Sequence, residues 1–226
     1  MMESLVDVEW LAEHLADPDL VVLDCSVVID MGADGMTMSS GRAPFEERHI
    51  PGAAFADLLV ALSDTDQPIG FAVPSPEAFC AAMGRLGVGD DHRVVLYDTA
   101  GSMWASRVWW MLRWVGFDRA AILDGGLNAW KAEDRPISTD PPTHPQRYLR
   151  PRPRPDLIAD RDEVLAAISD DKVHLIDTLT GVSFGGEAGL YGRGGHIPTA
   201  VHIGGMDLVD ETGHYRPLKD LRAMHE

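Results

Sequence analysis

The chain has 226 residues, of which 45% are hydrophobic and 24% charged, a composition typical of a globular protein with a substantial core. Its net charge of -17, without any basic stripe, argues against nucleic acid as a partner. No apolar run approaches the roughly 20 residues that cross a bilayer, and the acidic N-terminus is unlike a signal peptide, so we expect a cytoplasmic protein without a membrane partner.

Strands and helices are predicted to alternate from the start of the chain. Residues 8–15 have the apolar spacing of a helix, and residues 20–24 are apolar on both faces, as in a buried parallel strand. A loop rich in glycine and methionine is expected at 31–41. The Ser-Pro pair at 75–76 supplies an N-cap and a first helical residue, and Gly87 closes the helix that they begin.

The alternation continues through the middle of the chain. Residues 93–97 and 120–123 are predicted as strands, and residues 103–115 as the helix between them. A Gly-Gly turn at 125–126 leads into a short helix at 127–132. Strands that alternate with helices favour a parallel sheet with helices on both faces, so the predicted fold class is α/β.

The loop between strand 93–97 and helix 103–115 is the first candidate site. A loop that leads from a strand into a helix N-terminus presents free backbone N–H groups and the positive end of the helix dipole, which together bind anions. Asp98 stands at the base of this loop, where covalent chemistry would need a nucleophile. Its carboxylate could act as a general base, but no partner is evident, so we favour a role in accepting hydrogen bonds from the loop.

Residues 138–156 are rich in proline and arginine and have no periodicity, which predicts an interdomain linker. A phosphate-binding role for the basic run at 147–154 is the less favoured alternative. After the linker, a helix is predicted at 159–168 and a strand at 173–177. The order of elements therefore begins again.

The sequence His-Ile-Pro occurs at 49–51 and again at 196–198, each time after a predicted apolar strand. This is the mark of an internal repeat. Asp98 lies 49 residues after His49, so the equivalent loop of the second repeat is expected near position 245, past residue 226.

The domain prediction follows from this repeat. We expect an N-terminal domain at 1–137, the linker at 138–156, and at 157–226 a partial C-terminal domain that lacks its active-site loop.

The two His-Ile-Pro sequences, the Asp-Gly-Gly at 124–126 with Ala-Trp at 129–130, and the strand–loop–helix at Asp98 together resemble the tandem-domain rhodanese family, the thiosulfate and 3-mercaptopyruvate sulfurtransferases. The resemblance covers the whole chain. It implies two α/β rhodanese-like domains, each a five-stranded parallel sheet with helices on both faces, the second incomplete here. It also implies that the first domain is of the non-catalytic type, with Asp98 in the position of the catalytic cysteine.

The resemblance implies a sulfurtransferase that moves a sulfane sulfur from thiosulfate or 3-mercaptopyruvate to cyanide or a thiol through a cysteine persulfide. The partners would then be a small-molecule donor and acceptor, and the catalytic cysteine would lie beyond residue 226. The family pattern Arg-aromatic-Arg-Gly-Glu is replaced by Ser-Phe-Gly-Gly-Glu at 183–187, which leaves Arg193 as the nearest candidate for binding the donor. The alternative is a catalytically inactive rhodanese-like module that binds an anion or a protein partner.

The remaining candidate residues have simpler interpretations. Cys25 and Cys80 are too few for a disulfide framework and are interpreted as packed thiols. His49 and His196, each before Ile-Pro, are interpreted as turn-fixing residues. The nine histidines lack the spacing of metal ligands, so neither a metal nor a cofactor is expected.

Overall fold

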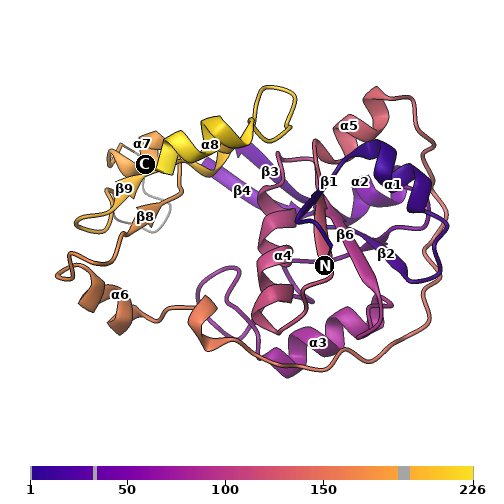
Figure 1. Ribbon diagram of the computed structural model, residues 1–226, viewed down its shortest axis with the longest axis horizontal. Coiled ribbons are helices and arrows are strands. Elements are labelled where there is room, and N and C mark those ends of the chain that lie inside the picture. Colours follow the sequence, from indigo (N-terminus) through magenta and orange to yellow (C-terminus); the bar gives the residue numbers. More distant parts are fainter. Residues whose placement is uncertain (1, 33–34, 188–193, 226) are drawn as a thin grey trace. The chain divides into compact units, whose positions relative to one another are not determined.

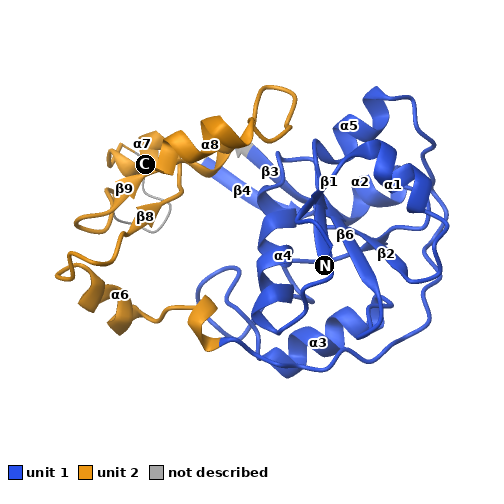
Figure 2. Ribbon diagram, in the orientation of Figure 1, with its two compact units in different colours: residues 1–154 blue, residues 155–226 orange. Residues whose placement is uncertain are grey.

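The structure is a computed structural model that describes residues 2–32, 35–187 and 194–225 (Figure 1). It consists of two compact units, Met1–Arg154 and Pro155–Glu226 (Figure 2). The boundary between the units therefore falls inside the stretch that the sequence predicts as a linker. Within the described ranges, no helix is both long enough and apolar enough to span a bilayer.

The first unit is built around a five-stranded sheet. Its strand order is β1-β7-β6-β2-β5, and each neighbouring pair is parallel, which confirms the predicted α/β fold. The elements of this unit, in chain order, are β1 (Leu5–Val6), α1 (Val8–His14), β2 (Leu20–Asp24), β3 (Val27–Gly32), β4 (Gly35–Ser40), α2 (Arg42–Glu47), β5 (Ala54–Phe55), α3 (Pro76–Arg85), β6 (Arg93–Tyr97), α4 (Met103–Trp114), β7 (Ala120–Leu123) and α5 (Gly126–Ala132).

Helices cover both faces of this sheet, which explains why its strands are apolar throughout. On one face, α1, α2 and α5 pack Leu11, Phe45 and Trp130 into a cluster with alternate residues of the central strands, such as Val95. On the other face, α4 packs against β6 and β7. All five residues of β2 are buried, because successive side chains point into opposite layers of the core.

The prediction of a loop at 31–41 is wrong in part. The strands β3 and β4 pair in antiparallel fashion from Val27 opposite Ser40 to Gly32 opposite Gly35, and so form a separate two-stranded ribbon. The residues of β4 (Gly-Met-Thr-Met-Ser-Ser) are mostly exposed and show no strong apolar alternation. A strand of this kind is formed by backbone pairing, so its side chains give little sequence signal.

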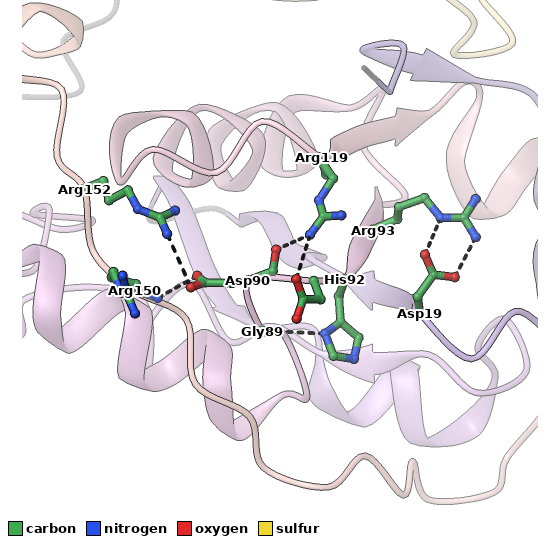
Figure 3. Close-up of polar contacts among 9 residues, drawn as sticks. Asp19, Gly89, Asp90, His92, Arg93, Arg119, Arg150 and Arg152 are labelled. Atoms are coloured by element: carbon green, nitrogen blue, oxygen red, sulfur yellow. Dashed lines mark hydrogen bonds and ion pairs between the residues drawn. The ribbon is translucent and has the colours of Figure 1, made fainter.

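Residues 139–154, which we call the strap, are held against the first unit by backbone and charged contacts. The Arg147 N–H donates to the carbonyl of Gly84 at 2.9 Å. Asp90 accepts the Arg150 N–H at 2.9 Å and pairs with the Arg152 guanidinium at 3.4 Å, as Figure 3 shows. The guanidinium groups of Arg152 and Arg154 thus pair with carboxylates of the protein itself.

The end of the strap is fixed by a two-pronged ion pair. Both terminal nitrogens of Arg154 donate to the carboxylate of Asp118, at 2.7 and 2.6 Å. This pair lowers the pKa of Asp118, because the guanidinium favours the charged carboxylate. The Arg154 N–H also donates to the carbonyl of Trp114 at 2.7 Å, which attaches the strap to the end of α4.

The second unit has less regular structure. Its elements are a 3-10 turn (Pro155–Leu157), α6 (Arg161–Ala167), β8 (Ile176–Asp177), α7 (Gly181–Phe184), β9 (Val201–His202), a second 3-10 turn (Gly205–Leu208) and α8 (Leu218–His225). β8 and β9 pair in parallel, so the strand predicted at 173–177 is limited to its last two residues. Many of its apolar side chains are exposed, among them Ile158, Leu165, Val173, Val182, Val201 and Leu218.

Candidate functional site

Asp98 lies just past the end of β6, and its carboxylate is the centre of a ring of backbone donors. The residue is only 2% exposed. Its Oδ1 accepts the N–H groups of Ala100 and Ser102, at 2.8 and 3.0 Å. Its Oδ2 accepts those of Trp104 and Ala105, at 2.8 and 2.9 Å. We call these four N–H groups the cradle.

The cradle is also the N-terminal cap of α4. Ser102 stands in the N-cap position, but its backbone is left-handed, at φ 66°, and its side chain caps nothing. The two donors that reach Oδ2 belong to the first turn of α4, whose N–H groups have no partner inside the helix. Asp98 therefore supplies the cap from four residues upstream, and its negative charge lies at the positive end of the helix dipole.

A glycine on a neighbouring turn allows the loop to close. Gly126 has a φ of +57°, and a Cβ at this position would lie 2.3 Å from the carbonyl oxygen of Asp98. The following N–H, of Leu127, donates to that same carbonyl at 3.1 Å. The Asp-Gly-Gly motif at 124–126 thus has a physical role, because a side chain at Gly126 would push the loop away from the β7–α5 turn.

The Asp98 carboxylate has no remaining acceptor capacity. A carboxylate offers about four lone-pair positions, and four N–H donors occupy them here. The same arrangement around a thiolate would stabilise the anion and lower the pKa of the thiol. The geometry is therefore that of an anion site filled by a side chain of the chain itself.

A second buried carboxylate, Asp24, lies at the end of the adjacent strand β2. It is 2% exposed, and its Oδ1 accepts the N–H of Ser26 at 2.8 Å. Burial raises the pKa of Asp24, and the negative charge of Asp98 acts in the same direction. Burial likewise raises the pKa of Tyr97, whose hydroxyl accepts the Ile50 N–H at 3.3 Å.

Both cysteines of the chain are buried. Cys25 is fully buried at the end of β2, and burial together with the charges of Asp24 and Asp98 raises the pKa of its thiol well above the ordinary value. Cys80 lies within α3 at 2% exposure, and burial raises the pKa of its thiol to about 12. A thiol reacts as its thiolate, so neither environment favours nucleophilic chemistry.

The two His-Ile-Pro histidines make the same contacts in their own units. His49 stacks on Phe45 with ring centroids 4.2 Å apart, and its Nδ1 lies 2.7 Å from the carbonyl oxygen of that phenylalanine. His196 stacks on Phe184 at 3.7 Å, and its Nδ1 lies 2.9 Å from the corresponding carbonyl. In both cases the ring donates to a backbone carbonyl, as expected for a residue that fixes a turn.

The strand endings repeat as well. The N–H two residues after Asp24 binds its carboxylate at 2.8 Å, and the N–H two residues after Asp177 does so at 2.9 Å. Asp24 lies opposite Phe55 in the sheet, and Asp177 lies opposite His202. The internal repeat read from the sequence is thus present in backbone geometry.

Two further kinds of candidate residue remain, the predicted donor-binding arginine and possible metal ligands. Arg193, the predicted donor-binding residue, lies outside the described residues. Among the residues that the structure describes, no three histidine, cysteine or acidic side chains are grouped so as to hold a metal ion. The sequence predicts that Asp98 accepts hydrogen bonds from the loop, but not which four residues donate them, because backbone N–H groups carry no residue signature.

Comparison with known proteins gives consistent matches. The rhodanese-like domain family matches residues 7–133. The chain is 33% identical to the 3-mercaptopyruvate sulfurtransferase of Escherichia coli (strain K12), over 97% of this chain and 77% of that protein. It is 30% identical to the thiosulfate sulfurtransferase of Gallus gallus, over 98% of this chain and 76% of that protein. The crystal structure of the 3-mercaptopyruvate sulfotransferase SseA from Escherichia coli matches with a TM-score of 0.87 and 31% identity, over 99% of this chain and 82% of that one.

Proposed function

The chain belongs to the rhodanese family, and from this premise we propose that it is part of a sulfurtransferase that uses thiosulfate or 3-mercaptopyruvate as its donor. In this proposal the acceptor is cyanide or a thiol, and sulfur is carried as a cysteine persulfide. The cysteine that carries it is not among residues 1–226. Both reaction partners are small molecules.

The proposed reaction has two displacement steps. The cysteine thiolate attacks the outer sulfur of thiosulfate, the sulfur–sulfur bond of the donor breaks, and sulfite leaves with the bonding electron pair. Cyanide or a thiolate then attacks the outer sulfur of the persulfide and releases the original thiolate. Both steps need a thiolate held in a ring of hydrogen-bond donors, since the thiolate and the persulfide are anions.

The observation that carries the proposal is the cradle. It has the strand–loop–helix form and the donors that such a thiolate needs, but Asp98 occupies it. A carboxylate with every lone pair engaged cannot accept a proton from substrate without breaking the loop, so we assign Asp98 no catalytic role. We accordingly assign residues 1–137 to a non-catalytic rhodanese-like domain and residues 157–226 to part of a second one.

The two cysteines present support this assignment. Cys25 and Cys80 are both buried and both have a raised pKa, and neither stands at a helix N-terminus. We therefore propose that neither forms the persulfide. Arg193 stays a prediction for donor binding that rests on the sequence alone.

A catalytically inactive rhodanese-like module is the competing function. Two observations favour it: the only cradle within the described residues is filled by a carboxylate, and the sequence at 183–187 lacks the two arginines of the family pattern. In that case the protein would bind an anion or a protein partner without turnover.

Thiocyanate formation from thiosulfate and cyanide separates the two functions. We expect no turnover from the 226-residue chain, and coding DNA downstream of codon 226 should encode a cysteine at the start of a loop near position 245. Protein made from that longer frame should turn over. Turnover by the 226-residue chain that is lost in Cys25→Ser but kept in Cys80→Ser would refute the assignment of the cysteine. If the longer reading frame encodes no cysteine loop, or if it encodes one and its protein shows no turnover, the catalytically inactive module is the better assignment.

A thiol placed in the cradle tests the cradle itself. In a Cys25→Ser, Cys80→Ser background, Asp98→Cys leaves one thiol in the protein. The four N–H donors should lower its pKa below the ordinary value of about 8.5. The rate of reaction with iodoacetamide against pH measures this, and a rate profile like that of free cysteine would contradict the proposed anion site.

A further inference from the structure

The first unit contains a pocket that shares no lining residue with the cradle. It encloses about 400 Å³ between α2, β5, the C-terminal end of α3 and the strap. Arg42 and Arg85 both line it, from two different helices. In a chain of net charge -17, two guanidinium groups in one pocket are a local reversal of sign.

Both arginines are exposed, and neither is paired with a carboxylate among the described residues. Within the part of the chain that the structure describes, neither Arg42 nor Arg85 has a carboxylate oxygen within 4.0 Å. Glu46 also lines the pocket and lies four residues after Arg42 on α2, a spacing that permits an ion pair, yet the pair is not formed. The guanidinium of Arg42 lies instead over the ring of Phe55, 4.9 Å from its centroid.

The rest of the lining is largely apolar. Phe45 and Phe55 contribute aromatic rings, Leu86 an aliphatic side chain, and Pro141 and Pro142 of the strap two rigid pyrrolidine rings. Covering such apolar surface with the carbon atoms of a ligand is favourable, because it removes the surface from water. A bare inorganic anion would leave it uncovered.

We propose that this pocket binds a small organic monocarboxylate whose carboxylate pairs with Arg42 and Arg85 and whose carbon frame covers the aromatic and proline surface. With the pocket's two histidines, His49 and His144, counted as neutral, two arginines against Glu46 give a net charge of +1, which matches a monoanion better than a phosphate dianion. A guanidinium and a carboxylate pair through two parallel hydrogen bonds, so the geometry of the charged group is also matched.

Benzoate is a suitable probe, because it joins one carboxylate to one flat carbon ring. We expect benzoate to bind the 226-residue protein saturably, with a dissociation constant of about 1 mM, which is typical of so small a ligand. Isothermal titration calorimetry and amide chemical shifts measure this binding. Benzyl alcohol and inorganic phosphate are the comparison ligands, one without the charge and the other without the carbon frame. Each should bind at least about tenfold more weakly.

Four variants locate the binding. Arg42→Gln and Arg85→Gln should each weaken benzoate about tenfold, and Glu46→Gln should strengthen it, because a repulsive carboxylate is removed. Arg48→Gln is the matched control: Arg48 is exposed and follows α2 but does not line the pocket, so its loss should change nothing. Tryptophan fluorescence melting confirms that each variant is folded, and two arginine positions guard against a single failure.

Three results would overturn the proposal. They are the absence of saturable benzoate binding, phosphate binding as tight as that of benzoate, and an equal loss in Arg48→Gln and Arg42→Gln. None of these measurements involves sulfur transfer, so the pocket and the proposed function can fail separately.

Discussion

The cradle predicts a specific cost for changing Asp98. Asparagine keeps the shape of the side chain but offers one carbonyl oxygen in place of two carboxylate oxygens. Whichever way the amide turns, its NH₂ group faces two of the four backbone N–H groups, and it cannot accept from either. Each lost hydrogen bond to a charged group costs about 1.5 kcal/mol or more, so Asp98→Asn should lower the free energy of unfolding by about 3 kcal/mol.

Alanine removes the acceptor altogether. All four N–H groups then lose their partner, but water can enter the space that the carboxylate leaves, so the losses do not simply add. We expect Asp98→Ala to cost about 3–5 kcal/mol, at the upper end of single substitutions. The unusual feature is that asparagine, the closest isostere, should lower the free energy of unfolding nearly as much as alanine.

Urea and thermal unfolding followed by tryptophan fluorescence measure this cost. All six tryptophans lie in the first unit, so the signal reports on the unit that contains the cradle. For a unit of this size, 3 kcal/mol corresponds to a fall in Tm of about 6–12 °C. Asp134→Asn is the control: Asp134 is exposed, has a φ of 53° that asparagine also adopts, and should change stability by less than about 0.5 kcal/mol.

The decisive comparison is between Asp98→Asn and its control. An asparagine variant as stable as the Asp134→Asn protein would mean that the four donors find other acceptors. The cradle would then not be a site that requires an anion, and the argument for its role would fail.

Three further predictions test the surrounding structure. Gly126→Ala should lower stability and speed amide exchange at Leu127, because the new Cβ would lie 2.3 Å from the Asp98 carbonyl oxygen; unchanged exchange would contradict that contact. Cys80, whose pKa is raised to about 12, should react with iodoacetamide at pH 8 about a thousandfold more slowly in the folded than in the unfolded protein, as counted by mass spectrometry. The lowered pKa of Asp118 means that its ion pair with Arg154 stabilises the fold above the unfolded pKa near 3.8 and is lost as pH falls through the lower folded value. Both side chains are about one-third exposed or more, so the effect should be about 1 kcal/mol or less, seen as a lower protection factor of the Arg154 amide at acid pH, relative to its intrinsic exchange rate, and absent from Asp118→Asn.

The features of this protein that depend on neighbours along the chain can be predicted from its residues alone. The apolar run at 20–23, which ends at Asp24, predicts a strand buried on both faces, since no polar residue interrupts it. Ser75 and Pro76 mark the start of α3, and the structure confirms that the Ser75 side chain accepts the Ala78 N–H at 3.2 Å. The two His-Ile-Pro sequences revealed the repeat, and each histidine contacts the carbonyl of an earlier phenylalanine, four residues before His49 and twelve before His196.

Which distant residues these elements bring together depends on the folded chain. The four donors around Asp98 are main-chain groups, which every residue except proline possesses, so the strand–loop–helix pattern predicts that the loop donates to Asp98 but not which four residues do so. The contact of Gly126 with the Asp98 carbonyl depends on the pairing of β6 with β7, and the pocket between Arg42 and Arg85 depends on where the strap passes α2 and the end of α3. Periodicity along a chain records which face of an element is buried, whereas the convergence of distant elements depends on strand order and register, which are set by the packing of the whole core.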